Sequence, residues 1–403
     1  MTTSASSARG DKPGSGSLHL RGTVISTILR HDAKTTSYKI ALLRGINDVA
    51  LAYPDIPTDR PVAISLSVLA RFWLAYYWPF ADRSEPIWQG ARNRRREGVA
   101  QDMAFRDELT ALKEEWEQHW GVKSAPADGF VLIDEMHVAR RRRLYPPSLL
   151  QAYEAALRAI ARTIEMPIRY AGTGNWSVFP RPAPLADIPE LVTALPGTPS
   201  ASRCLVVPAE VWLLFRELSL WVEALCIHQW ALFTEGVDPE GGRKADRGEV
   251  YRLLTDRPDN RRPLTWERNQ VDILLLEGHS FTCPWTRRAL RKGIPYDMDH
   301  LVPVSVHPIN ELWNLVPTDP AFNQHAKRDR LPSCERLRQA EPILTDTYCT
   351  YATSPAMRQA LNEDARRRFV AVPGASDAQP AVIARAAVNF LEQIAVSRNM
   401  ARF

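Results

Sequence analysis

The sequence has few cysteines, and they are not arranged in a way that would hold a structural zinc ion. Five cysteines are scattered along 403 residues, and no two of them stand as C-x-x-C. This spacing argues against a disulfide framework and against a cysteine-rich zinc site, and it is typical of a reducing cytoplasm. We therefore expect a cytoplasmic protein with no structural zinc.

Uninterrupted apolar runs are scarce as well. One segment, residues 211–233, is long enough to span a bilayer, but charged residues such as Arg216 and Glu223 interrupt it. An amphipathic helix buried in a soluble fold is the favoured interpretation, so no membrane insertion is expected. Residues 1–17 have no apolar core either, which indicates a disordered lead-in and not a signal peptide.

The composition is otherwise that of a soluble globular protein of two or three domains. Hydrophobic residues make up 45% and charged residues 24% of the chain, and the formal net charge is +5. This charge is modest for a nucleic-acid binder. Arginine runs are often solvated helix faces, but a run beside a nuclease motif becomes a candidate for phosphate contacts. The candidates of this kind are Arg287, Arg288, Arg291 and Lys292.

Helical patterns dominate residues 18–237. Apolar residues recur at helical spacing in residues 35–53, 64–80, 106–120 and 147–164. An aromatic row, Phe72 to Trp78, could form a base-stacking platform, but core packing is the favoured interpretation. A glycine-rich and charged stretch, residues 238–248, is the best linker. We expect a helical regulatory or binding region over residues 18–237 and a second domain over residues 249–403.

The chemistry is concentrated in residues 280–333. Asp299 and His300 begin a short strand-like run that Pro303 should end, and residues 312–316 form a second such run. Asp319 is then a good N-cap and Pro320 an ideal first residue for a helix to Arg330. The order is strand, loop, strand, helix.

In such a helix, Asn323 lies in the first turn and Lys327 lies one turn later on the same face. Asn323 can then project towards the strand that carries Asp299. Carboxylate and amide oxygens suit a hard cation such as Mg²⁺ or Mn²⁺ better than a four-ligand zinc.

Three segments in order resemble the HNH, or ββα-metal, endonuclease family. They are DHLVP at 299–303, WNLVPTD at 313–319 and FNQHAKRDRLPS at 322–333. The resemblance implies an α+β chain: a mostly α-helical N-terminal region followed by a C-terminal ββα-metal nuclease domain with flanking helices. It also implies a DNA endonuclease that nicks one strand per site.

The resemblance assigns roles to individual residues. His300 would be the general base, Asn314 would hold the loop that orients it, and Asp299 and Asn323 would bind one divalent ion per site. Lys327 would contact a flanking phosphate, and we add the neighbouring basic residues Arg328 and Arg330 as candidate nucleic-acid contacts.

The sequence departs from the family pattern in two places. Many HNH domains have two C-x-x-C pairs, of which only Cys283 remains, so we expect packing of Phe281 and Trp285 to replace that zinc knuckle. Lys327 also follows Asn323 by four residues where three is common. His325 is therefore an alternative third ligand, although Asn323 is favoured. Asp297 and His307 are nearby, and we expect both to be exposed loop residues.

Alternatives remain at this point. An HNH nuclease could cut RNA instead of DNA, because such a site contacts phosphates and sugars more than bases. A nucleic-acid-binding protein with an inactive HNH fold is the second alternative. The N-terminal segments HDAKTTSYKIALLR and FWLAYYWPF resemble bacterial HNH proteins found with antiphage systems, of which the nickase of type II Zorya systems is one candidate. That resemblance would imply antiviral defence and other defence-system proteins as partners.

Overall fold

The computed structural model describes residues 25–31, 34–90, 102–171, 177–237, 242–256, 264–304, 310–372 and 377–403. The expected lead-in at residues 1–17 and His307 lie outside these ranges. Within them the chain is mostly helical, as predicted, and it also has three small sheets.

The N-terminal elements form one group around a single hydrophobic cluster that runs from Ile25 to Leu254. Most of the expected helices are present, and α4 coincides with the predicted residues 106–120. The helices of this group are η1 (Thr27–His31), α2 (Tyr38–Ala52), α3 (Leu66–Tyr77), η2 (Trp78–Phe80), α4 (Arg106–Trp120), α5 (Asp128–His137), α6 (Ala139–Arg142), α7 (Pro147–Arg169), η3 (Leu185–Asp187), α8 (Ala209–Glu217), α9 (Ser219–Glu235) and α10 (Arg247–Thr255).

A four-stranded sheet, which the sequence analysis did not predict, covers part of this helical group. Its strands are β1 (Val62–Ser65), β2 (Ala183–Pro184), β3 (Thr193–Ala194) and β4 (Arg203–Val207), in the order β2-β4-β1-β3. Strand β1 is antiparallel to β4 and parallel to β3. Because β2 and β3 have only two residues each, they are too short to give an alternating sequence signal.

The aromatic row of α3 packs in the core, as favoured. Trp73, Tyr77 and Trp78 are fully buried, and Tyr76 is 2% exposed. Tyr77 packs edge-on against Phe105 with ring centroids 5.1 Å apart. These rings are therefore not accessible to a nucleic-acid base.

The segment at 211–233 is two helices and not one. Helix α8 ends at Glu217, and α9 begins at Ser219 after Leu218. Among the described residues, no helix is both long enough and apolar enough to cross a membrane.

The C-terminal elements surround a second hydrophobic cluster, from Val271 to Ala395. Helices α13 and α15 pack along each other and support two small hairpins. The elements are α11 (Thr265–Leu276), β5 (Phe281–Thr282), β6 (Ala289–Leu290), β7 (Asp297–His300), η4 (Leu312–Asn314), β8 (Leu315–Thr318), α12 (Pro320–Phe322), η5 (Asn323–Lys327), α13 (Cys334–Tyr351), α14 (Pro355–Arg368) and α15 (Pro380–Ser397).

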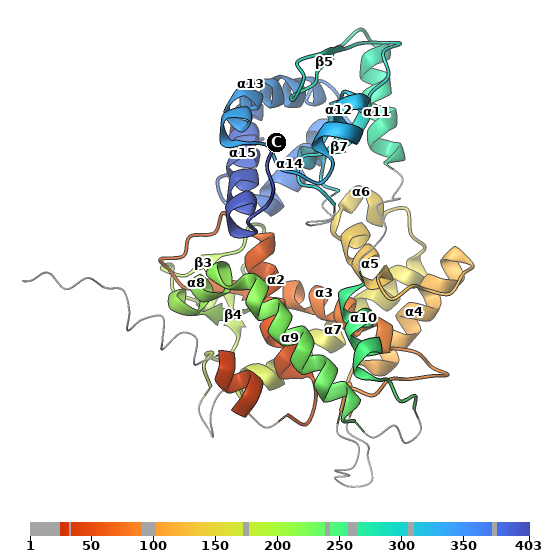
Figure 1. The fold of residues 1–403 in the computed structure, drawn as a ribbon, viewed down its shortest axis with the longest axis vertical. Helices are drawn as coiled ribbons and strands as arrows, with labels where there is room; N and C mark the ends of the chain where they lie inside the picture. Colours follow the sequence, from red (N-terminus) through yellow and green to blue (C-terminus); the bar gives the residue numbers. More distant parts are fainter. Residues whose placement is uncertain are drawn as a thin grey trace, which may run out of the picture.

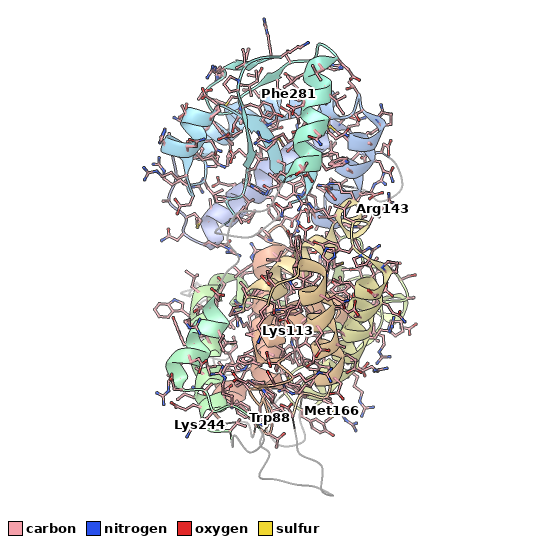
Figure 2. The ribbon with its side chains drawn as sticks, turned by 90° about the vertical axis from the view of Figure 1, so that its right-hand side faces the viewer. Trp88, Lys113, Arg143, Met166, Lys244 and Phe281 are labelled. Atoms are coloured by element: carbon pink, nitrogen blue, oxygen red, sulfur yellow. The ribbon has the colours of Figure 1, made fainter. Side chains whose placement is uncertain are left out.

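The two groups form two lobes (Figures 1 and 2). Helix α10 packs against α9, and its residues Val250 and Leu254 belong to the first cluster. The first lobe therefore extends past residue 249, where we expected the second domain to begin. Helices α5 and α6 face the second lobe, and Figure 2 shows Arg143 where the lobes meet.

Candidate active site

Strands β7 and β8 form the antiparallel hairpin that holds the Asp-His pair. Asp299 is opposite Val316, and His300 is opposite Leu315. Both strands are displaced from the expected ranges. The first begins at Asp297, two residues early, and the second begins at Leu315 because a 3₁₀ turn occupies residues 312–314. The expected order of strand, strand and helix is nevertheless present.

The helix after β8 begins as predicted and then departs from α-helical geometry. The side chain of Asp319 accepts a hydrogen bond from the amide of Ala321, and Pro320 is the first helical residue. From Asn323 to Lys327 the chain is a π-helix, in which the amide of Arg328 donates to the carbonyl of Asn323 at 3.1 Å. A π-turn holds one residue more than an α-turn. The extra residue between Asn323 and Lys327 is accommodated in this way.

Asp299 and Lys327 form a buried ion pair at the centre of the site. The Lys327 ammonium lies 2.6 Å from one carboxylate oxygen of Asp299, and the Lys327 side chain is 1% exposed. The Trp285 indole donates to the other carboxylate oxygen at 3.3 Å. The ammonium also donates to the carbonyl of His300. The predicted phosphate contact by Lys327 is therefore not what this structure shows, because an ionised carboxylate binds the ammonium inside the protein.

Asp297 belongs to the site, contrary to our expectation of an exposed loop residue. It is the first residue of β7 and shares a face of the strand with Asp299, since side chains alternate along a strand. Its carboxylate accepts hydrogen bonds from Asn323 at 3.3 Å and from Gln324 at 3.1 Å. His325 is exposed. The structure thus directs Asn323 towards the strand.

His300 is half-buried and makes one defined side-chain hydrogen bond. Its Nε2 atom lies 2.8 Å from the side-chain oxygen of Asn310. Burial lowers the pKa of His300, while the hydrogen bond to Asn310 and the charge of Asp299 oppose that change. The net lowering favours a neutral imidazole at neutral pH, which is the form that a general base requires.

Asn314 holds the backbone just beyond His300. It is fully buried, and its side-chain oxygen accepts a hydrogen bond from the amide of Val302 at 2.8 Å. Its own carbonyl accepts from the amide of Leu301. Asn314 therefore holds the two backbone amides that directly follow His300.

The basic residues around the hairpin are mostly exposed. Arg287 donates to Gln339 on α13, and Arg288 lies 3.4 Å from the carboxylate of Asp319. Arg330 is half-buried and donates to the carbonyl of Ala326. The exposed members of the predicted set are Arg287, Arg288, Arg291, Lys292 and Arg328.

The aromatic residues expected to replace a zinc knuckle are both buried. Phe281 packs against Tyr351 with centroids 5.8 Å apart, and Trp285 packs edge-on against Phe403 at 5.5 Å. Cys283 is fully buried in the same cluster. The hairpin of β5 and β6 is therefore attached to α13 and to the end of the chain by ring contacts.

The donor atoms suit a hard cation by type. The carboxylates of Asp297 and Asp299 and the amide of Asn323 offer oxygen ligands from one strand and the helix opposite it. In the part of the chain that the structure describes, no group of three or more His, Cys, Asp or Glu side chains is placed to hold a metal ion. Because the Lys327 ammonium pairs with Asp299, a cation at this carboxylate would replace a positive charge already present.

Buried ion pairs connect the site to the N-terminal lobe. Arg140 on α6 lies 3.0 Å from Glu267 and 2.7 Å from Asp364, and it also donates to the backbone carbonyl of Asn310 at 2.9 Å. Arg368 pairs with Glu311 and donates to the carbonyl of Ala52. These contacts were not predicted, because their partners lie far apart in the sequence.

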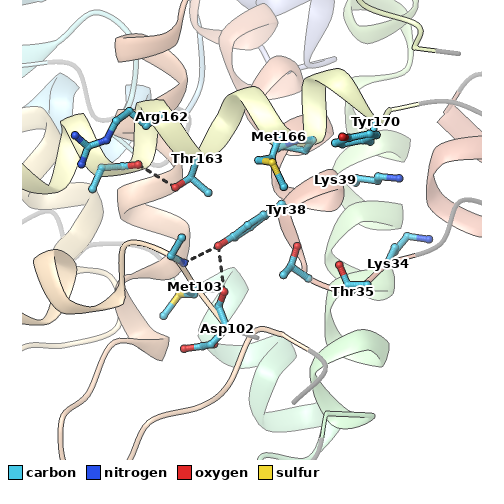
Figure 3. A pocket seen from close by; sticks show the side chains of 14 residues that line it. Lys34, Thr35, Tyr38, Lys39, Asp102, Met103, Arg162, Thr163, Met166 and Tyr170 are labelled. Atoms are coloured by element: carbon cyan, nitrogen blue, oxygen red, sulfur yellow. Dashed lines mark hydrogen bonds between the residues drawn. The ribbon is translucent and has the colours of Figure 1, made fainter. Parts of the chain in front are cut away.

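A separate pocket of about 910 Å³ lies in the N-terminal lobe, between α2 and α7 (Figure 3). Several of its polar groups are already hydrogen-bonded within the protein. Tyr38 donates to the carbonyl of Asp102 and accepts from the amide of Ala104, and Lys34 donates to the carbonyl of Leu29. None of the predicted site residues lines this pocket. The candidate site is therefore the hairpin and helix of the second lobe.

Comparison with known families divides the chain in a similar way. A family model described as a domain of unknown function, DUF8808, matches residues 16–254, which is more than half of the chain. A model described as HNH endonuclease matches residues 283–333, which contain the hairpin of β7 and β8 and the helix after it. No curated protein and no solved structure matches the chain.

Proposed function

The chain belongs to the DUF8808 family and has an HNH endonuclease domain at residues 283–333, and we propose that it is a metal-dependent DNA endonuclease that cuts one strand per site. The observation that carries the proposal is the placement of Asp299, His300 and Asn323. One hairpin and the helix that follows it bring these three residues into one unit.

His300 is the general base in this proposal. Its Nε2 atom is engaged by Asn310, which leaves Nδ1 as the nitrogen that takes a proton from the attacking water. The neutral form is favoured by burial, which lowers the pKa of His300. Asn314 fixes the backbone at Val302 and thereby limits the directions in which the imidazole can point.

Asp299 and Asn323 would hold one Mg²⁺ or Mn²⁺ ion, with Asp297 beside them as a further oxygen donor. When bound, such an ion would neutralise the charge that develops on the scissile phosphate and stabilise the leaving oxygen. His325 stays the alternative ligand, and its exposed position makes it the weaker candidate. Lys327 must release the Asp299 carboxylate before this group can serve as a ligand.

DNA is the proposed substrate, and nicking is the proposed outcome. A single base and a single cation site act on one phosphodiester bond at a time. The exposed cations next to the hairpin, among them Arg287, Arg291 and Lys292, supply charge that can neutralise backbone phosphates without reading a sequence.

Supercoiled plasmid is the substrate that tests this proposal. With Mg²⁺, the purified full-length protein should convert it to relaxed circles before linear product accumulates, and EDTA should stop the reaction. An RNA of the same length, incubated under the same conditions, tests the alternative that the protein cuts RNA instead of DNA. Cleavage of the RNA but not of the plasmid, or no metal-dependent cleavage of either, would contradict the proposal.

We also propose a role in antiphage defence, together with other defence-system proteins. This part rests on the resemblance of the HDAKTTSYKIALLR and FWLAYYWPF segments to bacterial HNH proteins found with antiphage systems, such as the type II Zorya nickase. Plaque counts on cells that carry the gene and its neighbours, with wild-type protein or His300→Ala, provide the test. Equal plaque counts in both strains would refute a defence role for this site.

A further inference from the structure

Asn310 joins the candidate general base to the N-terminal lobe. Its side chain lies between His300 and Asp134, with Oδ1 2.8 Å from Nε2 of His300 and Nδ2 2.7 Å from a carboxylate oxygen of Asp134. Asn310 is 2% exposed. Asp134 lies on α5, in the last two turns of the helix, and is separated from Asn310 by 176 residues of sequence.

The backbone of Asn310 is fixed independently of these two bonds. Arg140 donates to its carbonyl at 2.9 Å while pairing with Glu267 and Asp364. The residue therefore has little freedom apart from rotation of its terminal amide, which exchanges the oxygen and the nitrogen.

The chemistry of Asp134 decides which way that amide points. An ionised carboxylate can only accept hydrogen bonds, so the NH₂ group of Asn310 must face Asp134. The amide oxygen then faces His300. Asp134 has a cation nearby: burial disfavours the charge of Arg141, but Glu267, Glu135 and Asp134 together raise its pKa.

The amide in turn decides where the imidazole has its proton. Because the Asn310 oxygen can only accept, Nε2 of His300 must be the donor and has the proton in the neutral ring. Nδ1 is then the unprotonated nitrogen. Rotation of the amide would reverse this arrangement, since an NH₂ group facing Nε2 requires Nε2 to be the acceptor.

We propose that Asp134 is a positioning residue of the nuclease site, which acts through Asn310 to keep the His300 proton on Nε2 and so leaves Nδ1 free to accept a proton from water. The tautomer follows from the hydrogen bonds alone, whereas its use in catalysis rests on the proposed function. The N-terminal lobe thereby completes a site that the HNH-matched residues 283–333 do not contain in full.

The tautomer can be measured without any activity assay. Long-range ¹H–¹⁵N spectra of the metal-free full-length protein, labelled at histidine, distinguish the two neutral forms, and the His300→Gln spectrum assigns the signals. Wild-type protein should show His300 with the proton on Nε2. In Asp134→Asn the new amide can donate to Asn310, so the Nδ1-protonated form should appear.

Two control variants distinguish the loss of the Asp134–Asn310–His300 hydrogen bonds from a general loosening of the contact between the lobes. Asp55→Asn makes the same chemical change at another inter-lobe contact, the hydrogen bond from the amide of Val370 at 3.3 Å, and should leave the tautomer unchanged. Asp134→Glu keeps the carboxylate and should keep the wild-type tautomer. If Asp134→Asn retains the Nε2-protonated form, the proposal is overturned.

Kinetics then test the catalytic part. Under saturating Mg²⁺, Asp134→Asn should lower kcat by about 10- to 100-fold with little change in KM, as loss of an outer-shell partner usually does, while Asp55→Asn keeps the wild-type rate. An unchanged kcat in Asp134→Asn would refute the catalytic role. If the tautomer changes as expected but the wild-type protein cleaves nothing, the control of the His300 tautomer by Asp134 is supported and the proposed nuclease function fails.

Discussion

The two lobes differ in what they bury. The N-terminal lobe buries mostly rings and aliphatic side chains, including Trp73 and Trp78 of the aromatic row. The second lobe buries a carboxylate, an ammonium and an amide within one hairpin and helix, at Asp299, Lys327 and Asn314. Burying charge has a large free-energy cost unless the charge is paired. The buried pair of Asp299 and Lys327 lies within the residues that the HNH endonuclease model matches.

The boundary between the lobes has several buried ion pairs, whereas the buried Arg44 inside the first lobe lies over the Tyr76 ring and donates to the carbonyl of Leu254. Arg140 reaches across the boundary to the buried carboxylates of Glu267 and Asp364. Arg368 pairs with Glu311 within the second lobe and donates across the boundary to the carbonyl of Ala52. His137 on α5 lies within hydrogen-bond distance of Glu311, at 3.2 Å. Such pairs contribute little net stability but are costly to break, and they fix one arrangement of their partners. The interface therefore specifies how the N-terminal lobe meets the segment that holds Asn310 and Glu311.

The largest expected effect comes from removing Arg140. The variant Arg140→Ala leaves Asp364 buried without its ion-pair partner and leaves Glu267 with Arg141 at 3.5 Å, and we expect it to lose about 3–5 kcal/mol of unfolding free energy. Arg203→Ala, which breaks an exposed pair with Glu165, should lose at most about 1 kcal/mol. Urea unfolding of both variants makes the comparison. Equal losses would mean that the interface does not depend on buried charge.

The second-largest expected effect comes from breaking the ion pair between Lys327 and Asp299. Lys327→Ala leaves the Asp299 carboxylate buried and unpaired, which should lower unfolding free energy in EDTA by about 3 kcal/mol or more. Mg²⁺ should restore part of this loss, because a cation would take the place of the ammonium. Thermal unfolding with and without Mg²⁺ measures this recovery of stability. Lys113→Ala, at the partly exposed pair with Asp82, should show no such rescue. Identical Mg²⁺ responses of wild type and Lys327→Ala would argue against a cation site at Asp299.

Acid should weaken the lobe interface through His137. Burial, together with the charge of Arg71, lowers the pKa of His137 from 6.5 to about 4 despite its hydrogen bond to Glu311. The unfolded chain then takes up a proton below pH 6.5 while the folded one does not, so stability falls as the pH drops from 6.5 to about 4. The loss is on the order of 3 kcal/mol.

Unfolding midpoints measured across this pH range give the test. His137→Gln removes the titrating group and should flatten the profile between pH 6.5 and 5. Below the usual pKa of glutamate, a further loss is expected in both proteins, because Glu311 has a lowered pKa in the fold. If His137→Gln shows the same pH profile as wild type, His137 is not the group that causes the loss of stability.

The smallest effects belong to the exposed cations. Single replacements such as Arg291→Ala or Lys292→Ala should weaken DNA binding equally for all sequences and reduce the salt dependence of log Kd by about 1. Fluorescence anisotropy over a salt series measures this. Arg385→Ala, on α15 and paired with Glu341, is the matched surface control. A change in sequence preference would show that these residues contact bases.

Local sequence signals predicted much of this structure and failed where contacts are remote. The N-cap at Asp319, the strand-strand-helix order and the buried aromatic row all follow from patterns within a few residues. The roles of Asp134 and Asn310 depend on a contact across 176 residues, for which a single sequence holds no signal. Asp297 was missed because the strand was expected to begin at Asp299, two residues after its observed start.

The π-helix at residues 323–327 is a local feature that the sequence only partly predicted. The spacing of Asn323 and Lys327 showed that one residue was extra, but not whether His325 would take the place of Asn323. The structure accommodates the residue by widening one turn, and Asn323 keeps its contact with Asp297. Backbone widening of this kind is not encoded in residue spacing alone.

The most direct test of the nuclease site compares two histidines only 25 positions apart in the sequence. Single-turnover nicking of supercoiled plasmid in Mg²⁺ should fall by about 10²- to 10⁴-fold in His300→Ala, the loss expected for a general base. His325→Ala, which removes an exposed imidazole from the same helix as Asn323, should stay within about two-fold of wild type. Equal rates for wild type and His300→Ala would contradict the account, and a large loss only in His325→Ala would transfer the catalytic role to that residue.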